Sequence, residues 1–89
     1  MDWETIENEN KKIKKEFKFN DFEEAISFIN KIAELAEKEN HHPDIHIFYN
    51  LVVIELWTHS ISGISEKDFN LAAKIDEVFK DFFKSKNRL

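Results

Sequence analysis

The sequence predicts an α+β fold: a four-stranded antiparallel sheet with two helices packed on one of its faces, in the order β-β-α-β-β-α. Two segments alternate apolar and polar residues with the period of a strand, and two longer segments repeat apolar residues at the spacing of a helix. The turn signals between them leave only short connections, which favour antiparallel strands and a helical layer on one side. Because a chain of 89 residues can seldom support two cores, we expect one domain over residues 1–89.

The first two strands are predicted near the start of the chain. Within residues 12–19 the even positions are Lys or Glu, whereas three of the odd positions are apolar, a period-two pattern typical of a half-buried strand. The preceding residues 3–7 can pair with this strand across a polar turn at residues 8–10. So short a segment can equally be a frayed chain end, and the sequence leaves both interpretations open.

The first helix is predicted over residues 22–39. Asp21 and Glu24 have the spacing of a capping box at its start. Asn40 and Pro43 mark its end, because Asn tolerates a left-handed cap and Pro disfavours helical geometry in the residue before it. The apolar stripe expected to face the core consists of Phe22, Ala25, Ile26, Ile29, Ile32, Ala33 and Ala36.

Two further strands are predicted at residues 46–49 and 52–58, joined by a tight turn near Asn50. The even positions from 52 to 56 are apolar and share one face of the second of these strands. His59 follows the opposite parity, together with Trp57.

The second helix is predicted over residues 66–84. Ser65 and Asp68 form another capping box at its start. Its apolar stripe consists of Phe69, Ala72, Ile75, Val78, Phe79, Phe82 and Phe83. This stripe is rich enough in Phe to exceed the needs of one core, which favours self-association.

Composition excludes several classes of function. The net charge is −5 and Lys residues are mixed with Glu and Asp, so we expect no nucleic-acid partner. No stretch approaches the roughly 18 apolar residues of a membrane span, and the N-terminus lacks a signal-peptide pattern. We therefore expect a cytoplasmic protein with no membrane partner. The absence of Cys removes disulfides, thiolate nucleophiles and cysteine-ligated metal sites.

Four His residues lie between positions 41 and 59, and histidine is the side chain best suited to proton transfer near neutral pH. The residue types alone are also compatible with purely structural roles. His41 and His42 favour a helix end, where a cationic ring interacts with the backbone dipole. A metal site would need convergent ligands, and no conventional zinc spacing is present. Asp68 can be a helix cap only, and Trp57 or Tyr49 can be packing residues.

Together these residues resemble the signature of the pterin-4a-carbinolamine dehydratases. The similarity includes the spacing of its parts, which are Glu37-x-x-x-His41-His42-Pro43, Tyr49, Thr58-His59, and Asp68 within Glu66-Lys67-Asp68-Phe69-Asn70-Leu71-Ala72. A Trp near the start and the run Phe17-Lys18-Phe19 before Asp21-Phe22 extend the resemblance over most of the chain. The sequence departs from the family where Ser62 replaces a frequent second Gly, and where Trp57 is bulkier than expected.

The resemblance implies a four-stranded antiparallel sheet with helices on one side, in agreement with the periodicity. It also implies an enzyme that uses neither cofactor nor metal. Such an enzyme removes water from a 4a-hydroxytetrahydropterin and gives the quinonoid dihydropterin, a step of tetrahydrobiopterin recycling. The reaction needs one proton delivered to the departing hydroxyl and one removed from ring nitrogen N5.

Roles for the site residues follow from the same resemblance. His41 and His59 would exchange the two protons, one as acid and one as base, in an assignment that the sequence leaves open. His42 would hold the pterin, Asp68 would orient an imidazole, and Glu37 would be a supporting carboxylate. The further substrate-binding residues that the resemblance implies are Pro43, Trp57 and Thr58.

An exposed sheet edge and the family resemblance both favour a homodimer or homotetramer. The sequence is also compatible with two alternatives to catalysis in pterin recycling. One is a non-catalytic pterin-binding or protein-dimerisation module, because some animal relatives stabilise dimers of a homeodomain transcription factor. The other is a role near molybdopterin metabolism in an organism without aromatic amino-acid hydroxylases.

Overall fold

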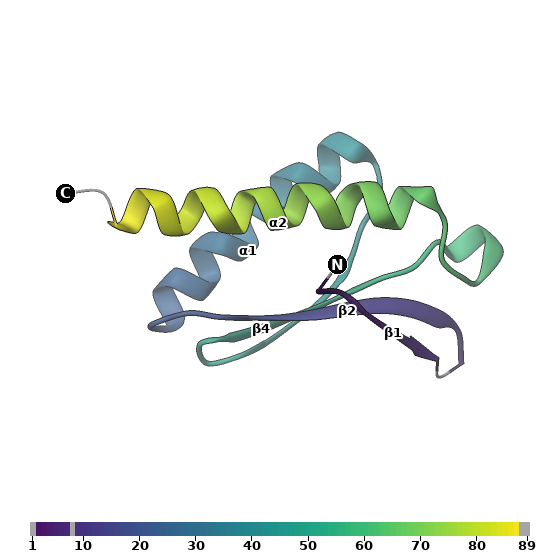
Figure 1. The fold of residues 1–89 in the computed structure, drawn as a ribbon, viewed down its shortest axis with the longest axis horizontal. Helices are drawn as coiled ribbons and strands as arrows, with labels where there is room; N and C mark the ends of the chain where they lie inside the picture. Colours follow the sequence, from purple (N-terminus) through teal and green to yellow (C-terminus); the bar gives the residue numbers. More distant parts are fainter. Residues whose placement is uncertain (1, 8, 88–89) are drawn as a thin grey trace.

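The computed structural model describes residues 2–7 and 9–87, with side chains described up to Phe82. Its four strands form one antiparallel sheet in the order β1-β2-β4-β3. Both helices lie on the same side of this sheet (Figure 1). The predicted α+β fold, with the element order β-β-α-β-β-α, is therefore confirmed.

The helices and strands lie close to their predicted positions. They are β1 (Glu4–Glu7), β2 (Lys11–Lys18), α1 (Phe22–Glu39), β3 (Asp44–Phe48), β4 (Leu51–Leu56), η1 (His59–Ile61) and α2 (Glu66–Asn87). The first helix coincides with its prediction, whereas β3 begins at Asp44 instead of residue 46, and α2 continues beyond residue 84 to Asn87. The short helix η1 is absent from the prediction.

The core lies between the sheet and the two helices. Val52, Ile54 and Leu56 of β4 are all 0% exposed, as their shared parity predicts. On the neighbouring strand, Ile13 lies opposite Leu56 and Phe17 lies opposite Val52. Aromatic rings with centroids 4.9 to 5.8 Å apart fill the rest of this layer; they belong to Phe17, Phe19, Phe28, Phe79 and Phe82.

The predicted apolar stripes of the helices are partly wrong. Phe28 and Leu71, which they omit, are 0% and 1% exposed, whereas Phe22 and Phe69, which they include, are 49% and 45% exposed. Phe28 is buried because α1 faces α2 as well as the sheet: its ring centroid lies 5.1 Å from that of Phe17 on β2 and 5.8 Å from that of Phe79 on α2. The exposed pair lies in the first turns of the helices. Phe83 lies outside the residues whose side chains are described.

Residues 3–7 are held in place and are not a frayed end. Strand β1 pairs with β2 along its whole length. The indole of Trp3 is buried, and its Nε1 donates to the carboxylate of Asp76 on α2, with oxygens at 3.1 and 3.2 Å. Lys15 of β2 binds the same carboxylate, with Nζ 2.8 Å from Oδ1. The start of the chain is therefore tied to both layers.

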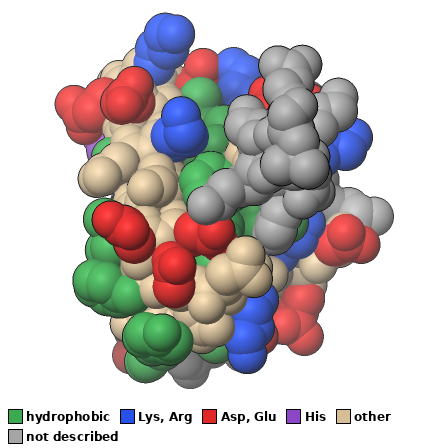
Figure 2. All heavy atoms as spheres, turned by 90° about the vertical axis from the view of Figure 1, so that its left-hand side faces the viewer, with side chains coloured by type: hydrophobic (Ala, Val, Ile, Leu, Met, Phe, Trp, Pro, Cys, Tyr) green, Lys and Arg blue, Asp and Glu red, His purple; other side chains and the backbone are tan. Residues whose placement is uncertain are grey.

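The surface combines mixed charges with a few exposed hydrophobic side chains. Figure 2 shows one end of the molecule, where acidic and basic groups are both present and hydrophobic side chains are exposed between them. The large exposed hydrophobic residues are Phe22, Phe48, Tyr49, Ile61 and Phe69. Within the described part of the chain, neither helix is long and apolar enough to span a membrane.

Candidate active site

Helix α1 ends at Glu39 with Asn40 as its C-cap, and the two adjacent histidines that follow point in different directions. Asn40 adopts the left-handed conformation expected from the sequence, with φ 52° and ψ 40°. The ring of His41 contacts Asp68 in the first turn of α2, whereas the ring of His42 contacts Glu37 of α1. The two neighbouring imidazoles therefore have separate partners.

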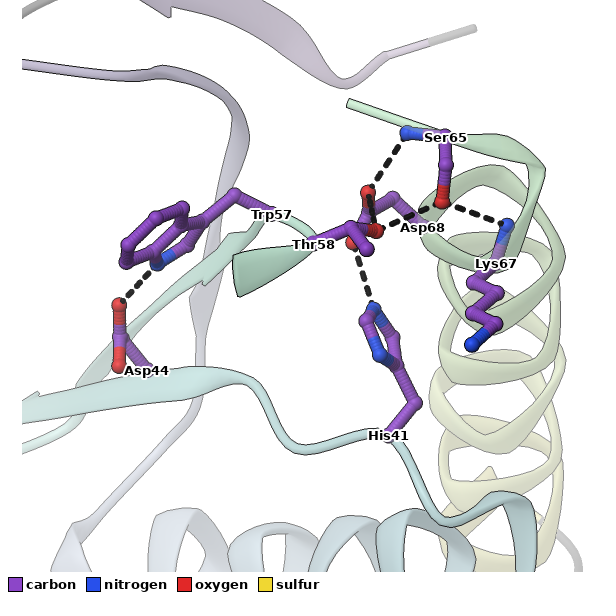
Figure 3. Close-up of polar contacts among 7 residues, drawn as sticks. All are labelled: His41, Asp44, Trp57, Thr58, Ser65, Lys67 and Asp68. Atoms are coloured by element: carbon purple, nitrogen blue, oxygen red, sulfur yellow. Dashed lines mark hydrogen bonds and ion pairs between the residues drawn. The ribbon is translucent and has the colours of Figure 1, made fainter. Parts of the chain in front are cut away.

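Asp68 lies at the centre of a buried polar network (Figure 3). Its side chain is 0% exposed, and its Oδ1 lies 2.7 Å from Nε2 of His41. Its Oδ2 accepts hydrogen bonds from the Thr58 hydroxyl at 2.8 Å and from the backbone N–H of Ser65 at 2.9 Å. The bond from the Ser65 N–H is one half of the predicted capping box. The Ser65 hydroxyl accepts from the Lys67 N–H at 3.3 Å, and the Asp68 N–H donates to the Ser65 carbonyl oxygen at 3.0 Å. Asp68 thus caps α2 and also supports His41.

The contacts of Asp68 indicate where the protons of this network lie. The Thr58 hydroxyl donates its one proton to Asp68, so the Ser65 hydroxyl, 2.6 Å away, donates to Thr58. We assign a hydrogen to Nε2 of His41, because the carboxylate that faces it is an acceptor. Nδ1 of His41 is then the nitrogen available to a substrate. It accepts a proton when the ring is neutral and donates one when the ring is charged.

His42 has a carboxylate partner at the surface. Its Nε2 lies 2.6 Å from Oε2 of Glu37. The two side chains are 56% and 78% exposed, so the pair contributes little to stability. The contact can still restrict the orientation of the His42 ring.

The third histidine lies in a loop whose shape the sequence does not predict. Two backbone hydrogen bonds between Thr58 and Gly63, of 2.7 and 3.3 Å, close this loop after β4. Helix η1 lies inside the loop and begins at His59. Ser62 adopts φ 51°, a left-handed conformation that glycine adopts without strain. Ser62 therefore takes a glycine-like conformation at the position where the family resemblance leads us to expect a second Gly.

The His59 ring stacks on the indole of Trp57, with ring centroids 3.9 Å apart and planes inclined by 21°. The indole Nε1 donates a hydrogen bond to Oδ2 of Asp44 at 3.0 Å (Figure 3). The His59 side chain is exposed. Among the described residues, neither of its ring nitrogens has a hydrogen-bond partner. His59 is therefore held by ring stacking, in contrast to the other two histidines.

A cavity of about 380 Å³ opens where the end of α1, the loop after β4 and the first turn of α2 meet. Small-molecule sites typically measure roughly 300–1,000 Å³, so this volume suits a single small ring system. The residues that line it are Asn40, His41, His42, Pro43, Asp44, Thr58, His59, Ser60 and Lys67.

The cavity brings most of the predicted site residues together. Five of the eight line it: His41, His42, Pro43, Thr58 and His59. The other three, Asp68, Glu37 and Trp57, each contact one of the lining histidines. Four further lining residues are not predicted from the sequence, although each directly adjoins a predicted site residue in the chain: Asn40, Asp44, Ser60 and Lys67.

The fourth histidine and the tyrosine of the signature lie elsewhere. His46 is exposed on β3 and does not line the cavity. Tyr49 occupies the turn between β3 and β4, where it adopts φ 55° and is 66% exposed. Across the described ranges, no three His, Cys, Asp or Glu side chains are grouped so as to hold a metal ion. The chemistry available to the lining groups is proton transfer by imidazoles, two of which have a carboxylate partner: Asp68 for His41 and Glu37 for His42.

Comparisons with known proteins relate the chain to one group. The model of a family described as pterin 4 alpha carbinolamine dehydratase matches residues 1–78. A Saccharolobus solfataricus protein named "Putative pterin-4-alpha-carbinolamine dehydratase" is 46% identical over 78 residues, which are 88% of this chain and 79% of that protein.

Two solved structures share the fold. A transcriptional coactivator/pterin dehydratase from Brucella melitensis has a TM-score of 0.80 and 36% identity, covering 86% of this chain and 81% of its own. A pterin dehydratase-like protein, identified as a RuBisCO assembly factor in the alpha-carboxysome, has a TM-score of 0.75 and 22% identity. The likeness covers 89% of this chain and 90% of that chain, and at this identity it shows the fold alone.

Proposed function

This chain belongs to the pterin 4 alpha carbinolamine dehydratase family, and we propose that it removes water from a 4a-hydroxytetrahydropterin to give the quinonoid dihydropterin. The observation that carries the proposal is the cavity that three histidines line, one of them hydrogen-bonded to the buried carboxylate of Asp68. This arrangement offers an acid and a base in a space suited to one small ring system. The names of the relatives supply the substrate class.

In the proposed reaction the bond between C4a and the hydroxyl oxygen breaks, and the bond between N5 and C4a becomes double. One imidazole of the pair His41 and His59 protonates the leaving hydroxyl, which departs as water. The other accepts the proton that N5 loses. A proton then returns from the second ring to the first through solvent, so the enzyme is restored and no co-reactant is consumed.

The remaining residues would hold the two partners of the proton transfer in place. Asp68 holds the ring of His41 so that Nδ1 is available. His42, whose ring contacts Glu37, would contact the pterin. Pro43 and Thr58 line the cavity beside the histidines. These roles follow the family resemblance, and their support is the proximity of the side chains.

The reaction would be one step of tetrahydrobiopterin recycling in the cytoplasm, with a separate reductase consuming the product. A homodimer or homotetramer is the expected assembly. Strand β3 lies at an edge of the sheet, and Phe48 and Tyr49 at its end are 63% and 66% exposed. Analytical ultracentrifugation of the purified protein tests this expectation.

The decisive experiment measures the decay of 4a-hydroxytetrahydropterin generated in situ by a hydroxylase. Wild-type protein should accelerate this decay, and His41→Ala or His59→Ala should reduce the acceleration by about 10²- to 10⁴-fold, the usual contribution of a general acid or base. His46→Ala is the matched control, because His46 is exposed outside the cavity. Circular dichroism verifies that each variant is folded. Full activity in both cavity variants would contradict the proposed mechanism.

A protein-binding role is the second candidate. The exposed aromatic side chains at the turn between β3 and β4 favour it, as does the solved relative described as a transcriptional coactivator/pterin dehydratase. The same assay separates the two candidates. A folded wild type that leaves the decay rate unchanged would favour a non-catalytic module.

A further inference from the structure

We propose that Trp57 is a positioning residue that fixes the His59 imidazole, and that it is not a surface on which the pterin ring stacks. The inference rests on the proposed dehydratase function. It replaces the substrate-binding role that the family resemblance implies for Trp57. Three observations carry it. The rings of Trp57 and His59 stack, other residues hold the indole, and no described residue hydrogen-bonds the His59 ring.

The stack occupies the indole with a residue of the protein itself. The rings of Trp57 and His59 have centroids 3.9 Å apart and planes within 21° of parallel, which is the geometry of face-to-face contact. Trp57 is not among the residues that line the cavity, whereas His59 and Asp44, both of which it contacts, are. The indole therefore supports lining residues from behind.

Groups on three neighbouring strands hold the indole. Asp44, the first residue of β3, accepts its N–H at 3.0 Å, and Trp57 itself directly follows β4. Lys12 of β2 lies over the ring, with Nζ 5.5 Å from the centroid, and is held there by Glu55 of β4 at 3.2 Å. Lys12 and Glu55 have only 20% and 18% of their side chains exposed, so solvent screens this arrangement less than a fully exposed pair. The indole is thus fixed by the sheet.

His59 needs such support more than the other cavity histidines. Carboxylates hold Nε2 of His41 and Nε2 of His42, at 2.7 and 2.6 Å. Among the residues the structure describes, no group bonds either ring nitrogen of the exposed His59. An imidazole in this situation would sample several rotamers. Stacking selects one orientation and leaves both nitrogens free to exchange protons with a substrate.

Steady-state kinetics of three variants test the inference. Trp57→Leu removes the stacked face and should lower kcat about three- to tenfold with KM nearly unchanged, because aromatic pairs of this kind shift populations by such factors. Trp57→Phe keeps an aromatic face and should restore most of kcat. Phe22→Leu removes an exposed aromatic ring at the start of α1, outside the cavity, and should leave both constants unchanged. A raised KM with unchanged kcat in Trp57→Leu would show a substrate platform and overturn the proposal, as would unchanged kinetics.

A spectroscopic measurement separates this inference from the proposed function. In substrate-free protein, the indole ring current should move the NMR signals of the His59 ring protons upfield of those of exposed His46, and Trp57→Leu should abolish the difference. Unshifted His59 signals in an active wild type would overturn the positioning role alone. Shifted signals in a wild type without dehydratase activity would overturn the dehydratase proposal and still support the fixing of His59 by Trp57.

Discussion

Asp68 accepts three hydrogen bonds inside the protein, from His41, from the Thr58 hydroxyl and from the backbone of Ser65. Two of these bonds complete the start of α2 and the loop after β4, and the third reaches the candidate site. An amide at this position would retain one acceptor oxygen but would place an NH2 group against either His41 or the donors of Thr58 and Ser65. The residue therefore links the tautomer of His41 to the geometry of a helix start.

Replacing Asp68 with Asn tests this link. The amide can remain compatible with Thr58 and Ser65 only if its NH2 group donates to Nε2 of His41, which moves the ring hydrogen to Nδ1. We expect kcat to fall about 10²-fold, because Nδ1 of the neutral His41 ring then carries a hydrogen and can no longer accept a proton from the substrate. The free energy of unfolding should fall by only about 1–3 kcal/mol, the usual cost of weakening a charge-assisted bond. Unchanged kcat in a folded variant would contradict the proposed orienting role.

Ser62 and Gly63 are neighbours in the loop after β4 but differ in backbone conformation. Ser62 adopts the left-handed conformation at φ 51°, whereas Gly63 has no positive φ. We expect Ser62→Gly to stabilise the protein by about 0.5–1 kcal/mol, because the strain of a side chain in this conformation exceeds the added chain entropy of glycine. Gly63→Ala should be nearly neutral, since an added Cβ meets only the Ile61 carbonyl oxygen at 3.7 Å, an ordinary contact. Thermal unfolding of both variants checks the pair, and a destabilised Ser62→Gly would refute it.

The helices and strands could be predicted from the sequence because the residues that cap them and the periodic patterns within them are local. The capping residues Asp21 and Ser65 and the stop at Asn40 placed both helix starts and the first helix end. The buried face of α1 was harder to predict, because it depends on contacts with two other elements that no local pattern reveals. Helix η1 was missed for a related reason: three residues closed by a backbone bridge leave no periodicity to detect.

Phe28 and Phe22 provide a matched test of the buried face of α1. Phe28→Ala should lower the free energy of unfolding by about 3–5 kcal/mol, because it leaves a cavity among the aromatic rings of the core. Phe22→Ala removes the same atoms from a side chain that is 49% exposed and should cost clearly less. Urea denaturation of both variants gives the comparison. Equal losses would show that the assigned face of the helix is wrong.

The candidate site depends on contacts between segments that are far apart in the chain. The sequence predicted His41, His59 and Asp68 as site residues through family resemblance. The same resemblance predicted that Asp68 orients an imidazole, but not that this imidazole belongs to His41. It did not predict that His59 stacks on Trp57. These partners depend on how α1, β4 and α2 meet. Long-range contacts also hold the N-terminal strand, through the carboxylate of Asp76 on α2.

Trp3→Phe tests the contribution of this last tie. The variant keeps an aromatic ring in the core but loses the indole N–H that binds Asp76, and should lose about 1 kcal/mol of stability. Amide hydrogen exchange should accelerate in β1, a four-residue edge strand. Exchange in β3, the opposite edge strand, serves as the internal control and should stay the same. Equal acceleration in both strands would indicate global rather than local loosening.

Asp68 supports both the fold and the candidate site, and this has an evolutionary consequence. A descendant of this protein that abandoned catalysis for another task would still need its helix start and its folded loop, so selection for folding alone would retain Asp68. His59 is exposed and no described residue hydrogen-bonds its ring, so it would be free to drift under the same selection. Among relatives of this fold, the residue at the position of His59 is therefore a better marker of retained chemistry than the carboxylate at the position of Asp68.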